Sequence, residues 1–258
     1  MRTALIGYTG FIGSNLLDQI QFDDLYNSQN IQDIQGKKYD LILSCGTKAE
    51  RWKANLEPKK DWEGIKNLLD NLESVRTKQF ILISTVDVYP NPRDVDEDSE
   101  ISKDKFTQSY GRNRYKMEEF IKTNFSNFLF VRLPQLFGKD LKKNFVYDLV
   151  NDNALDFTDT DSHFQWYNLK NLWKDIQTAI KNGLYIVNFS VEPISAKDLA
   201  KYTLSSNFEN ETKKPPLIYN VQTKYGSLFG SKDRYIYHRE EILEQLKRFI
   251  TKERRERK

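Results

Sequence analysis

The chain has 258 residues, with 40 basic and 37 acidic side chains and a net charge of +3, a balance that argues against a nucleic-acid-binding protein. One cysteine and two histidines cannot form an internal disulfide or a histidine-rich metal cluster, so we expect no metal. No apolar stretch approaches the roughly 20 residues that a bilayer span needs, so we expect a cytoplasmic protein that binds no membrane.

The first predicted elements are a strand, a tight turn and a helix. Residues 2–6 form an apolar run typical of a buried strand, and residues 11–20 carry a helical pattern. Glycines in the connecting turn would permit a sharp reversal, close approach of backbone amides to a pyrophosphate, and tight packing of helix on strand. The helix N-terminus would attract phosphate charge. We therefore expect a dinucleotide to bind along Gly7, Thr9, Gly10, Phe11, Ile12 and Gly13.

A second strand is predicted over residues 22–27, and its end is where dinucleotide-binding folds distinguish NAD from NADP. An acidic residue there would bind the ribose 2′-hydroxyl, and a nearby arginine would favour a 2′-phosphate. The chain has Asn27 and Ser28 at this place, so the cofactor is NAD or NADP and the choice stays open. The next buried strand covers residues 39–45, and its short link to the second strand predicts a trimmed sheet.

The residues that carry chemistry follow a predicted helix over residues 62–72 and a buried strand over residues 80–83. Tyr110 and Arg114 lie four residues apart at the start of the next predicted helix, so they share one face. A tyrosine acts as a general acid or base only if its pKa falls from about 10 toward the working pH. We expect the cation one turn away to lower the pKa of Tyr110 electrostatically.

Together with the glycine spacing, three segments resemble the extended short-chain dehydrogenases/reductases, the NAD-dependent epimerase/dehydratase family that modifies nucleotide sugars. The resemblance covers most of the chain, most strongly residues 1 to about 190. It implies an α/β fold, a Rossmann-like doubly wound parallel sheet with a small, mostly C-terminal substrate lobe. The segments are Ile83-Ser-Thr-Val-Asp-Val-Tyr89, Tyr110-Gly-Arg-Asn-Arg114 and Arg132-Leu-Pro-Gln-Leu-Phe-Gly138.

The resemblance also implies catalytic roles. Thr85 would orient a sugar hydroxyl or carbonyl, and Tyr110 would move the hydroxyl proton while hydride passes between the sugar and the nicotinamide. Arg114 stands where the family has lysine; it keeps the charge but is bulkier and forked. Val86 and Asp87 replace the Asp-Glu pair of the sugar dehydratases, which argues against dehydration.

Further contacts are expected on the same basis. Cys45, Gly46 and Pro134 would touch the cofactor along with Tyr110 and Arg114, and Thr85, Val86, Asp87 and Asn144 would touch the substrate. Lys224 and Arg234 are interleaved with aromatic residues, a pattern that suits a nucleotide diphosphate or, alternatively, a solvated loop. The acidic run at residues 94–100 is interpreted as a solvated loop.

The domain organisation and remaining elements follow from the same patterns. Residues 1–140 plus about 165–190 would form the NAD(P)-binding Rossmann domain, and about 141–164 and 191–258 the substrate lobe. Strands are predicted over residues 128–133 and 185–189, and a final helix over residues 239–250. Ser195 is a predicted helix N-cap, with Asp198 three residues on.

The function that these patterns imply is an NAD(P)-dependent oxidoreductase of a nucleotide-linked sugar. A 4-keto-sugar reductase and an epimerase use the same residues, so both stay open, and a homodimer is expected from the resemblance. The alternative is a catalytically impaired NAD(P)-binding sensor or scaffold protein, because arginine replaces lysine at position 114.

Overall fold

A computed structural model describes residues 1–256 and divides the chain into two compact units. The first unit comprises Met1–Asn91, Ser99–Leu133 and Leu172–Val187. The second comprises Pro92–Asp98, Pro134–Asn171 and Asn188–Lys258.

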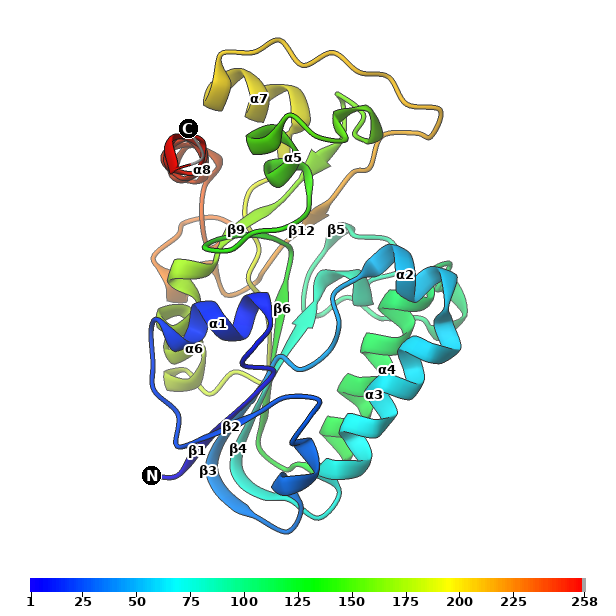
Figure 1. The fold of residues 1–258 in the computed structure, drawn as a ribbon, viewed down its shortest axis with the longest axis vertical. Coiled ribbons are helices and arrows are strands. Elements are labelled where there is room, and N and C mark those ends of the chain that lie inside the picture. The colour runs from blue at the N-terminus through cyan, green and yellow to red at the C-terminus, as the bar shows by residue number, and fades with distance from the viewer. Residues whose placement is uncertain (257–258) are drawn as a thin grey trace. The chain divides into compact units, whose positions relative to one another are not determined.

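A six-stranded sheet lies at the centre of the first unit, with strand order β10-β6-β4-β3-β1-β2 (Figure 1). The pairs β1–β2, β1–β3, β3–β4 and β4–β6 are all parallel. Only the short 3-10 helix η1 (Ile31–Ile34) connects β2 to β3, which confirms the trimmed sheet. The strands are β1 (Thr3–Ile6), β2 (Asp24–Tyr26), β3 (Lys38–Ser44), β4 (Arg76–Thr85), β6 (Phe128–Leu133) and β10 (Ile186–Asn188).

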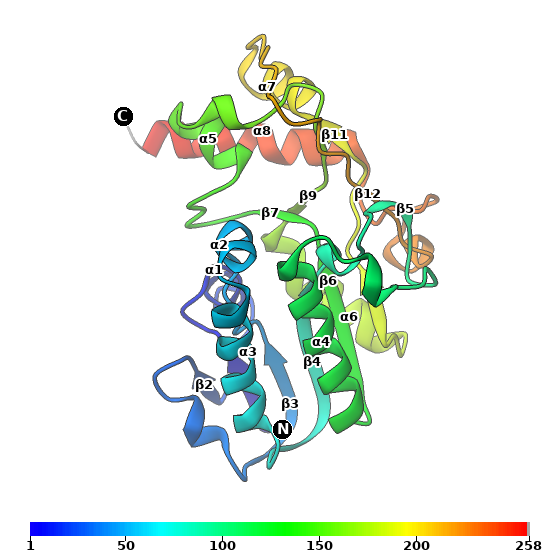
Figure 2. The same cartoon turned by 90° about the vertical axis from the view of Figure 1, so that its right-hand side faces the viewer.

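Helices cover both faces of this sheet. Helices α3 and α4 run along one face, and α1 and α6 lie on the other (Figures 1 and 2). This arrangement confirms the predicted doubly wound α/β fold, and the parallel strands bring their carboxyl ends to one edge of the sheet. The helices are α1 (Phe11–Leu17), α2 (Arg51–Leu56), α3 (Pro58–Leu72), α4 (Ser109–Asn124) and α6 (Leu172–Lys181), with short 3-10 turns η2 (Val86–Val88) and η3 (Lys103–Lys105).

Three helix boundaries differ from the sequence prediction. Helix α8 (Arg239–Glu256) continues past Ile250, where the predicted final helix ends. Helix α1 ends at Leu17 rather than near Ile20. Helix α3 begins at Pro58 rather than Trp62, because proline at the first helical position has no N–H to leave unpaired and already holds a helical φ angle. The preceding helix α2 was not predicted, since its six residues are too few to show a clear apolar period.

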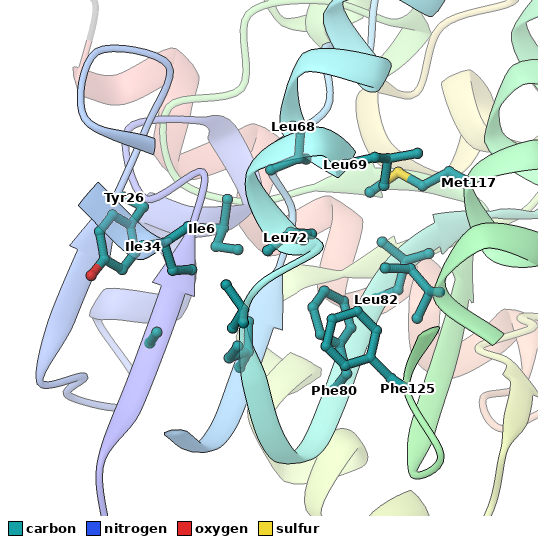
Figure 3. Packing of buried hydrophobic residues seen from close by; sticks show 14 of the residues in the cluster. Ile6, Tyr26, Ile34, Leu68, Leu69, Leu72, Phe80, Leu82, Met117 and Phe125 are labelled. Carbon is teal, nitrogen blue, oxygen red and sulfur yellow. The ribbon is translucent and has the colours of Figure 1, made fainter. Parts of the chain in front are cut away.

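The core between α3, α4 and the sheet holds α4 in place. Phe80 of β4 and Phe125, which follows α4, pack with ring centroids 4.5 Å apart (Figure 3). Leu72 from α3 and Met117 from α4 are buried in the same cluster. Burying large apolar side chains contributes roughly 1.5–3 kcal/mol each, so this packing fixes both helices on the sheet.

The second unit contains short strands and three longer helices. Strand β7 pairs with β9 and β12 with β5 in parallel, and β11 pairs with β8 in antiparallel fashion. Ser195 Oγ accepts a hydrogen bond of 3.1 Å from the Asp198 N–H, which confirms the predicted N-cap of α7. The strands are β5 (Arg93–Val95), β7 (Gln135–Phe137), β8 (His163–Phe164), β9 (Trp166–Asn168), β11 (Ile194–Ser195) and β12 (Asn220–Val221). The helices are α5 (Phe145–Asn151), α7 (Ala196–Leu204) and α8 (Arg239–Glu256), with 3-10 turns η4 (Leu155–Phe157), η5 (Leu169–Asn171) and η6 (Gly226–Phe229).

Within residues 1–256, none of the helices combines the length and apolar character needed to cross a bilayer.

Candidate functional site

The glycine turn after β1 is built from close backbone contacts. Gly7 has a φ of +90°, and a β carbon there would come within 2.7 Å of the Cys45 carbonyl group. A β carbon on Gly13 would lie 2.2 Å from the Gly7 carbonyl oxygen, so α1 packs on the strand only with glycine at this position. Gly10 is less crowded, because its β carbon would meet only the Gly7 carbonyl oxygen, at 3.3 Å.

The start of α1 is free of side-chain caps and acidic groups. Gly10 is the N-cap residue, it makes no side-chain capping hydrogen bond, and the first turn from Phe11 carries no acid. Backbone N–H groups at a helix start have no partner within the helix, and together they form the positive end of its dipole. The residues present therefore fit the pyrophosphate of a dinucleotide.

The segment that follows β2 is hydrogen-bonded to the glycine turn. Asn27 Nδ2 donates a hydrogen bond of 3.3 Å to the Tyr8 hydroxyl, and Asn27 Oδ1 accepts one of 2.8 Å from the Gln29 N–H. Ser28 is exposed. The pair supplies neither an acid for a ribose 2′-hydroxyl nor a cation for a 2′-phosphate, so the structure leaves the choice between NAD and NADP open.

Cys45 and Gly46 lie at the end of β3, directly against the glycine turn. The Cys45 thiol donates to the Ile6 carbonyl oxygen at 3.2 Å, and burial raises its pKa to about 12. The thiol is therefore a packing group rather than a nucleophile. A β carbon on Gly46 would lie 2.9 Å from the Ile6 side chain, so this segment also needs glycine to approach β1.

The structure brings Thr85, Asp87 and Tyr110 together. A β carbon on Gly111 would lie only 1.9 Å from the Asp87 carbonyl oxygen, so the first turn of α4 rests on η2, where Val86 is buried. Thr85 Oγ1 accepts a hydrogen bond of 3.1 Å from the Asp87 N–H, which leaves its own hydroxyl proton to be donated.

The Arg114 guanidinium lies over the Tyr110 ring and is bound by a carboxylate. Its guanidinium carbon is 4.4 Å from the centroid of the Tyr110 ring. Two of its nitrogens donate to Asp61 at 2.7 Å and 3.0 Å, and one of them also donates to the Lys48 carbonyl oxygen. The Arg114 and Asp61 side chains are only 5% and 9% exposed, so this is a buried ion pair.

The pKa of Tyr110 is raised, not lowered as the sequence led us to expect. Burial is the largest cause, because it disfavours the charged phenolate. Arg114 acts in the expected direction and lowers the pKa, as does Arg51, but the nearby carboxylates of Asp87 and Asp61 act against them. The sequence showed the cation and could not show the burial.

Several residues near Tyr110 were not predicted as site residues from the sequence. They lie in α2 and in the segment that directly precedes α4. Asn55 Oδ1 accepts a hydrogen bond of 2.9 Å from the Tyr110 N–H, which ties the start of α4 to α2. Arg51 lies 3.7 Å from the Asp87 carboxylate and donates to Gln108 Oε1 at 2.9 Å. No sequence signal identified them, because α2 itself was not predicted.

A second buried ion pair joins α4 to the central sheet. Glu118 binds Arg132 of β6 through contacts of 2.6 Å and 3.0 Å and accepts a hydrogen bond of 2.6 Å from Ser84 of β4. Arg132 also donates to the Tyr89 hydroxyl at 2.9 Å. This network fixes α4 to two strands two turns beyond Tyr110.

Two of the expected contact residues lie in the second unit with β7 and α5. Asn144 is the N-cap of α5, and its Oδ1 accepts from the Tyr147 N–H at 3.1 Å while its Nδ2 donates to the Leu136 carbonyl at 2.8 Å. The oxygen of this side chain therefore caps α5, and its nitrogen ties the cap to β7. Pro134 directly precedes β7.

The acidic run at residues 94–100 is not merely a solvated loop, because Asp96, Glu97 and Asp98 bind other groups of the second unit. Lys224 is paired with Asp98, and Arg234 with Asp96. Glu97 accepts hydrogen bonds from the Asn188 N–H at 2.7 Å and from Thr223 Oγ1 at 2.6 Å. The two expected substrate-binding cations thus have carboxylate partners.

Comparison with known proteins identifies the family of the chain. The family model for the NAD dependent epimerase/dehydratase family matches residues 4–161. No curated protein matches the chain.

Solved structures with the same fold include reductases and epimerases. One is a dTDP-4-dehydrorhamnose reductase from Bacillus anthracis in complex with NADP, with a TM-score of 0.74 and 19% identity over 97% of this chain and 98% of that one. A second is a UDP-glucose 4-epimerase from Thermotoga maritima with UDP-glucose, with a TM-score of 0.74 and 15% identity over 100% of both chains. A third is MoeE5 in complex with UDP-glucuronic acid and NAD, with a TM-score of 0.76 and 12% identity over 99% of this chain and 100% of that one. At these identities the likeness shows the fold alone.

Proposed function

The chain belongs to the NAD-dependent epimerase/dehydratase family, and on this basis we propose that it is an NAD(P)-dependent oxidoreductase of a nucleotide-linked sugar. The observation that carries the proposal is the group around Tyr110, where a guanidinium lies 4.4 Å from the ring centroid and Gly111 packs on the η2 turn that Thr85 caps. A phenol, a hydroxyl and a cation in this arrangement suit proton transfer to or from a sugar oxygen.

The cofactor would bind along the glycine turn and the strand ends beside it. Bound NAD or NADP would supply the hydride acceptor or donor. Gly7, Gly10 and Gly13 shape the turn, and the first residues of α1 offer N–H groups to the pyrophosphate. The further assigned contacts are Thr9, Phe11, Ile12, Asn27, Ser28, Cys45, Gly46, Tyr110, Arg114 and Pro134.

For the reaction, Tyr110 would hold or move the hydroxyl proton. Burial disfavours the phenolate, so Tyr110 carries the proton that it would donate to a carbonyl oxygen, while Arg114 acts in the opposite direction and lowers the pKa of the phenol. Thr85 would donate a hydrogen bond to the same oxygen, since its hydroxyl accepts from the Asp87 N–H and keeps its own proton. A 4-keto-sugar reductase and an epimerase both need such a proton donor, so both remain candidates.

The substrate contacts would be Thr85, Val86, Asp87 and Asn144, and its diphosphate would bind Lys224 and Arg234. The two cations would exchange the carboxylates of Asp98 and Asp96 for phosphate oxygens. The structures that resemble this chain include complexes with UDP-glucose and UDP-glucuronic acid, which is the substrate class proposed here. A homodimer, a cytoplasmic location and a role in polysaccharide biosynthesis are further predictions of the proposal.

The test is native mass spectrometry of the purified protein, followed by titration with NADH and with NADPH. Retained NAD favours an epimerase, which recycles its cofactor within one turnover. Reversible binding of reduced cofactor by a protein purified without it favours the reductase. Binding of neither cofactor would overturn the proposal.

A second candidate function is a sensor or scaffold that binds NAD(P) without turnover. The observation that favours it is the engagement of Arg114 by Asp61, which takes up the fork that would otherwise face a ribose. A panel of nucleotide sugars separates the two functions. Cofactor binding with no change of any sugar supports the sensor, and turnover that Tyr110→Phe abolishes supports the enzyme.

A further inference from the structure

The cation beside Tyr110 is held from outside its own helix. Arg114 makes a two-pronged ion pair with Asp61, which lies 53 residues earlier in the first turn of α3. The Lys48 carbonyl, on the segment after β3, accepts a further hydrogen bond from the same guanidinium. Three separate segments therefore meet at this one side chain.

Asp61 also holds the residue next to Arg114. Its Oδ2 accepts a hydrogen bond of 2.9 Å from Asn113 Nδ2, which also donates to the Pro58 carbonyl at 3.2 Å. One carboxylate thus contacts two successive residues of α4. This sets the rotation of α4 about its axis and, with it, the plane of the guanidinium.

We propose that Asp61 is a positioning residue that holds the Arg114 guanidinium over the Tyr110 ring, so that the pair acts as one unit in place of the single lysine of related enzymes. The inference rests on the proposed role of Tyr110 in catalysis. A planar guanidinium matches the two oxygens of a carboxylate, whereas a lysine ammonium is a point charge without that fixed geometry.

The burial of the pair explains why Arg114 depends on Asp61. A buried charge without a partner is costly, so without the carboxylate the long arginine side chain would turn toward water. The charged groups that face Tyr110 are Arg114 of α4, Arg51 of α2, Asp61 of α3 and Asp87 of η2. If Arg114 leaves, Tyr110 loses the cation that stacks on its ring.

Substitution of Asp61 should change the pKa of residue 110, and the sign of this change can be measured without substrate or cofactor. In Asp61→Asn, departure of the guanidinium should raise the pKa of residue 110. Removal of a negative charge with Arg114 still in place should lower that pKa instead. A positioning role and a purely electrostatic role of Asp61 therefore give opposite results.

The experiment uses a fluorinated tyrosine incorporated only at position 110 of the full chain and titrated by 19F NMR. Fluorine brings the phenol titration closer to neutral pH, and the label gives one assignable signal. The pKa should rise in Asp61→Asn and in Arg114→Met, by about one unit as for loss of a neighbouring charge. The double variant should match Asp61→Asn, because the guanidinium has already left the Tyr110 ring in that variant and its removal adds nothing further.

The control is Asp70→Asn, the same change in an exposed ion pair with Lys66 on the same helix, which should leave the titration unchanged. A lowered pKa in Asp61→Asn, or a double variant whose pKa is higher than that of Asp61→Asn, would overturn the inference. If Asp61→Asn does not fold, Asp61→Glu replaces it, because it keeps the charge but displaces the carboxylate by one methylene. A raised pKa in Asp61→Glu supports the positioning role, and an unchanged pKa overturns it. A different experiment tests the proposed function, which is wrong if neither NADH nor NADPH binds.

Discussion

The carbonyl oxygen of Asp87 occupies the place where a side chain on Gly111 would begin, because a β carbon there would lie 1.9 Å from it. This contact seats the first turn of α4 on η2. It is the reason that Tyr110, the residue before Gly111, lies beside the turn that Thr85 caps.

Gly111→Ala should separate α4 from η2. We expect destabilisation of about 1–3 kcal/mol from overpacking and a loss of turnover of about 100-fold from displacement of Tyr110. Gly64→Ala in α3 is the control, since nothing lies within 4 Å of a β carbon there, and it should stabilise the protein by about 0.5–1 kcal/mol. Urea unfolding and steady-state rates would measure both variants, and a fully active Gly111→Ala would contradict this account.

Gly10→Asp should abolish binding of NADH and NADPH, because the new carboxylate would repel the pyrophosphate at the start of α1. Gly10→Ala is the matched control, since its β carbon meets only one atom, at 3.3 Å, and it should keep most of the affinity. Fluorescence titration measures binding, and thermal unfolding checks that both variants fold. Unchanged affinity in Gly10→Asp would show that the pyrophosphate lies elsewhere.

Glu118→Gln should destabilise the first unit strongly. It leaves the buried Arg132 guanidinium without its counter-charge, which costs about 3–5 kcal/mol. Replacing both residues by methionine removes the unpaired charge and should cost less than the single change. Urea denaturation measures the free energy of unfolding of the parent protein, of Glu118→Gln and of the double methionine variant. A single variant as stable as the parent would mean that the ion pair does not hold α4.

Glu97 should give a pH-dependent contribution to the stability of the second unit. Burial raises its pKa above 4.5, so its favourable contribution is present below the unfolded-state pKa and is lost as pH rises through the folded-state value. Glu97→Gln does not titrate, so its stability relative to the parent should improve between about pH 4 and pH 7. Urea unfolding at three pH values in that interval measures the trend, and a relative stability that falls with pH would contradict the sign.

The fold was predictable where local patterns decide it. The apolar strands, the glycine turn and the spacing of Tyr110 and Arg114 each depend on residues close together in the chain, and the short link before β3 predicted the trimmed sheet. Helix α2 escaped prediction because a six-residue helix carries too little periodic signal.

The surroundings of Tyr110 were less predictable, because they depend on contacts between distant segments. In the sequence, Asp61 directly precedes the predicted amphipathic helix over residues 62–72, and such a position is normally solvated. Its role as the partner of Arg114 emerges only when α3 packs on α4. The raised pKa of Tyr110 has the same origin, since burial is a property of the whole fold.

The most direct test of Tyr110 as the proton donor compares Tyr110→Phe with the parent protein on a panel of nucleotide sugars and their 4-keto forms. Turnover should fall by about 10²–10⁴-fold, as for loss of a general acid, while NADH or NADPH still binds. Tyr115→Phe, a change on the same helix where the ring packs 6.0 Å from that of Phe106, should leave turnover unchanged. Full turnover in Tyr110→Phe would contradict the assignment of Tyr110 as the catalytic acid.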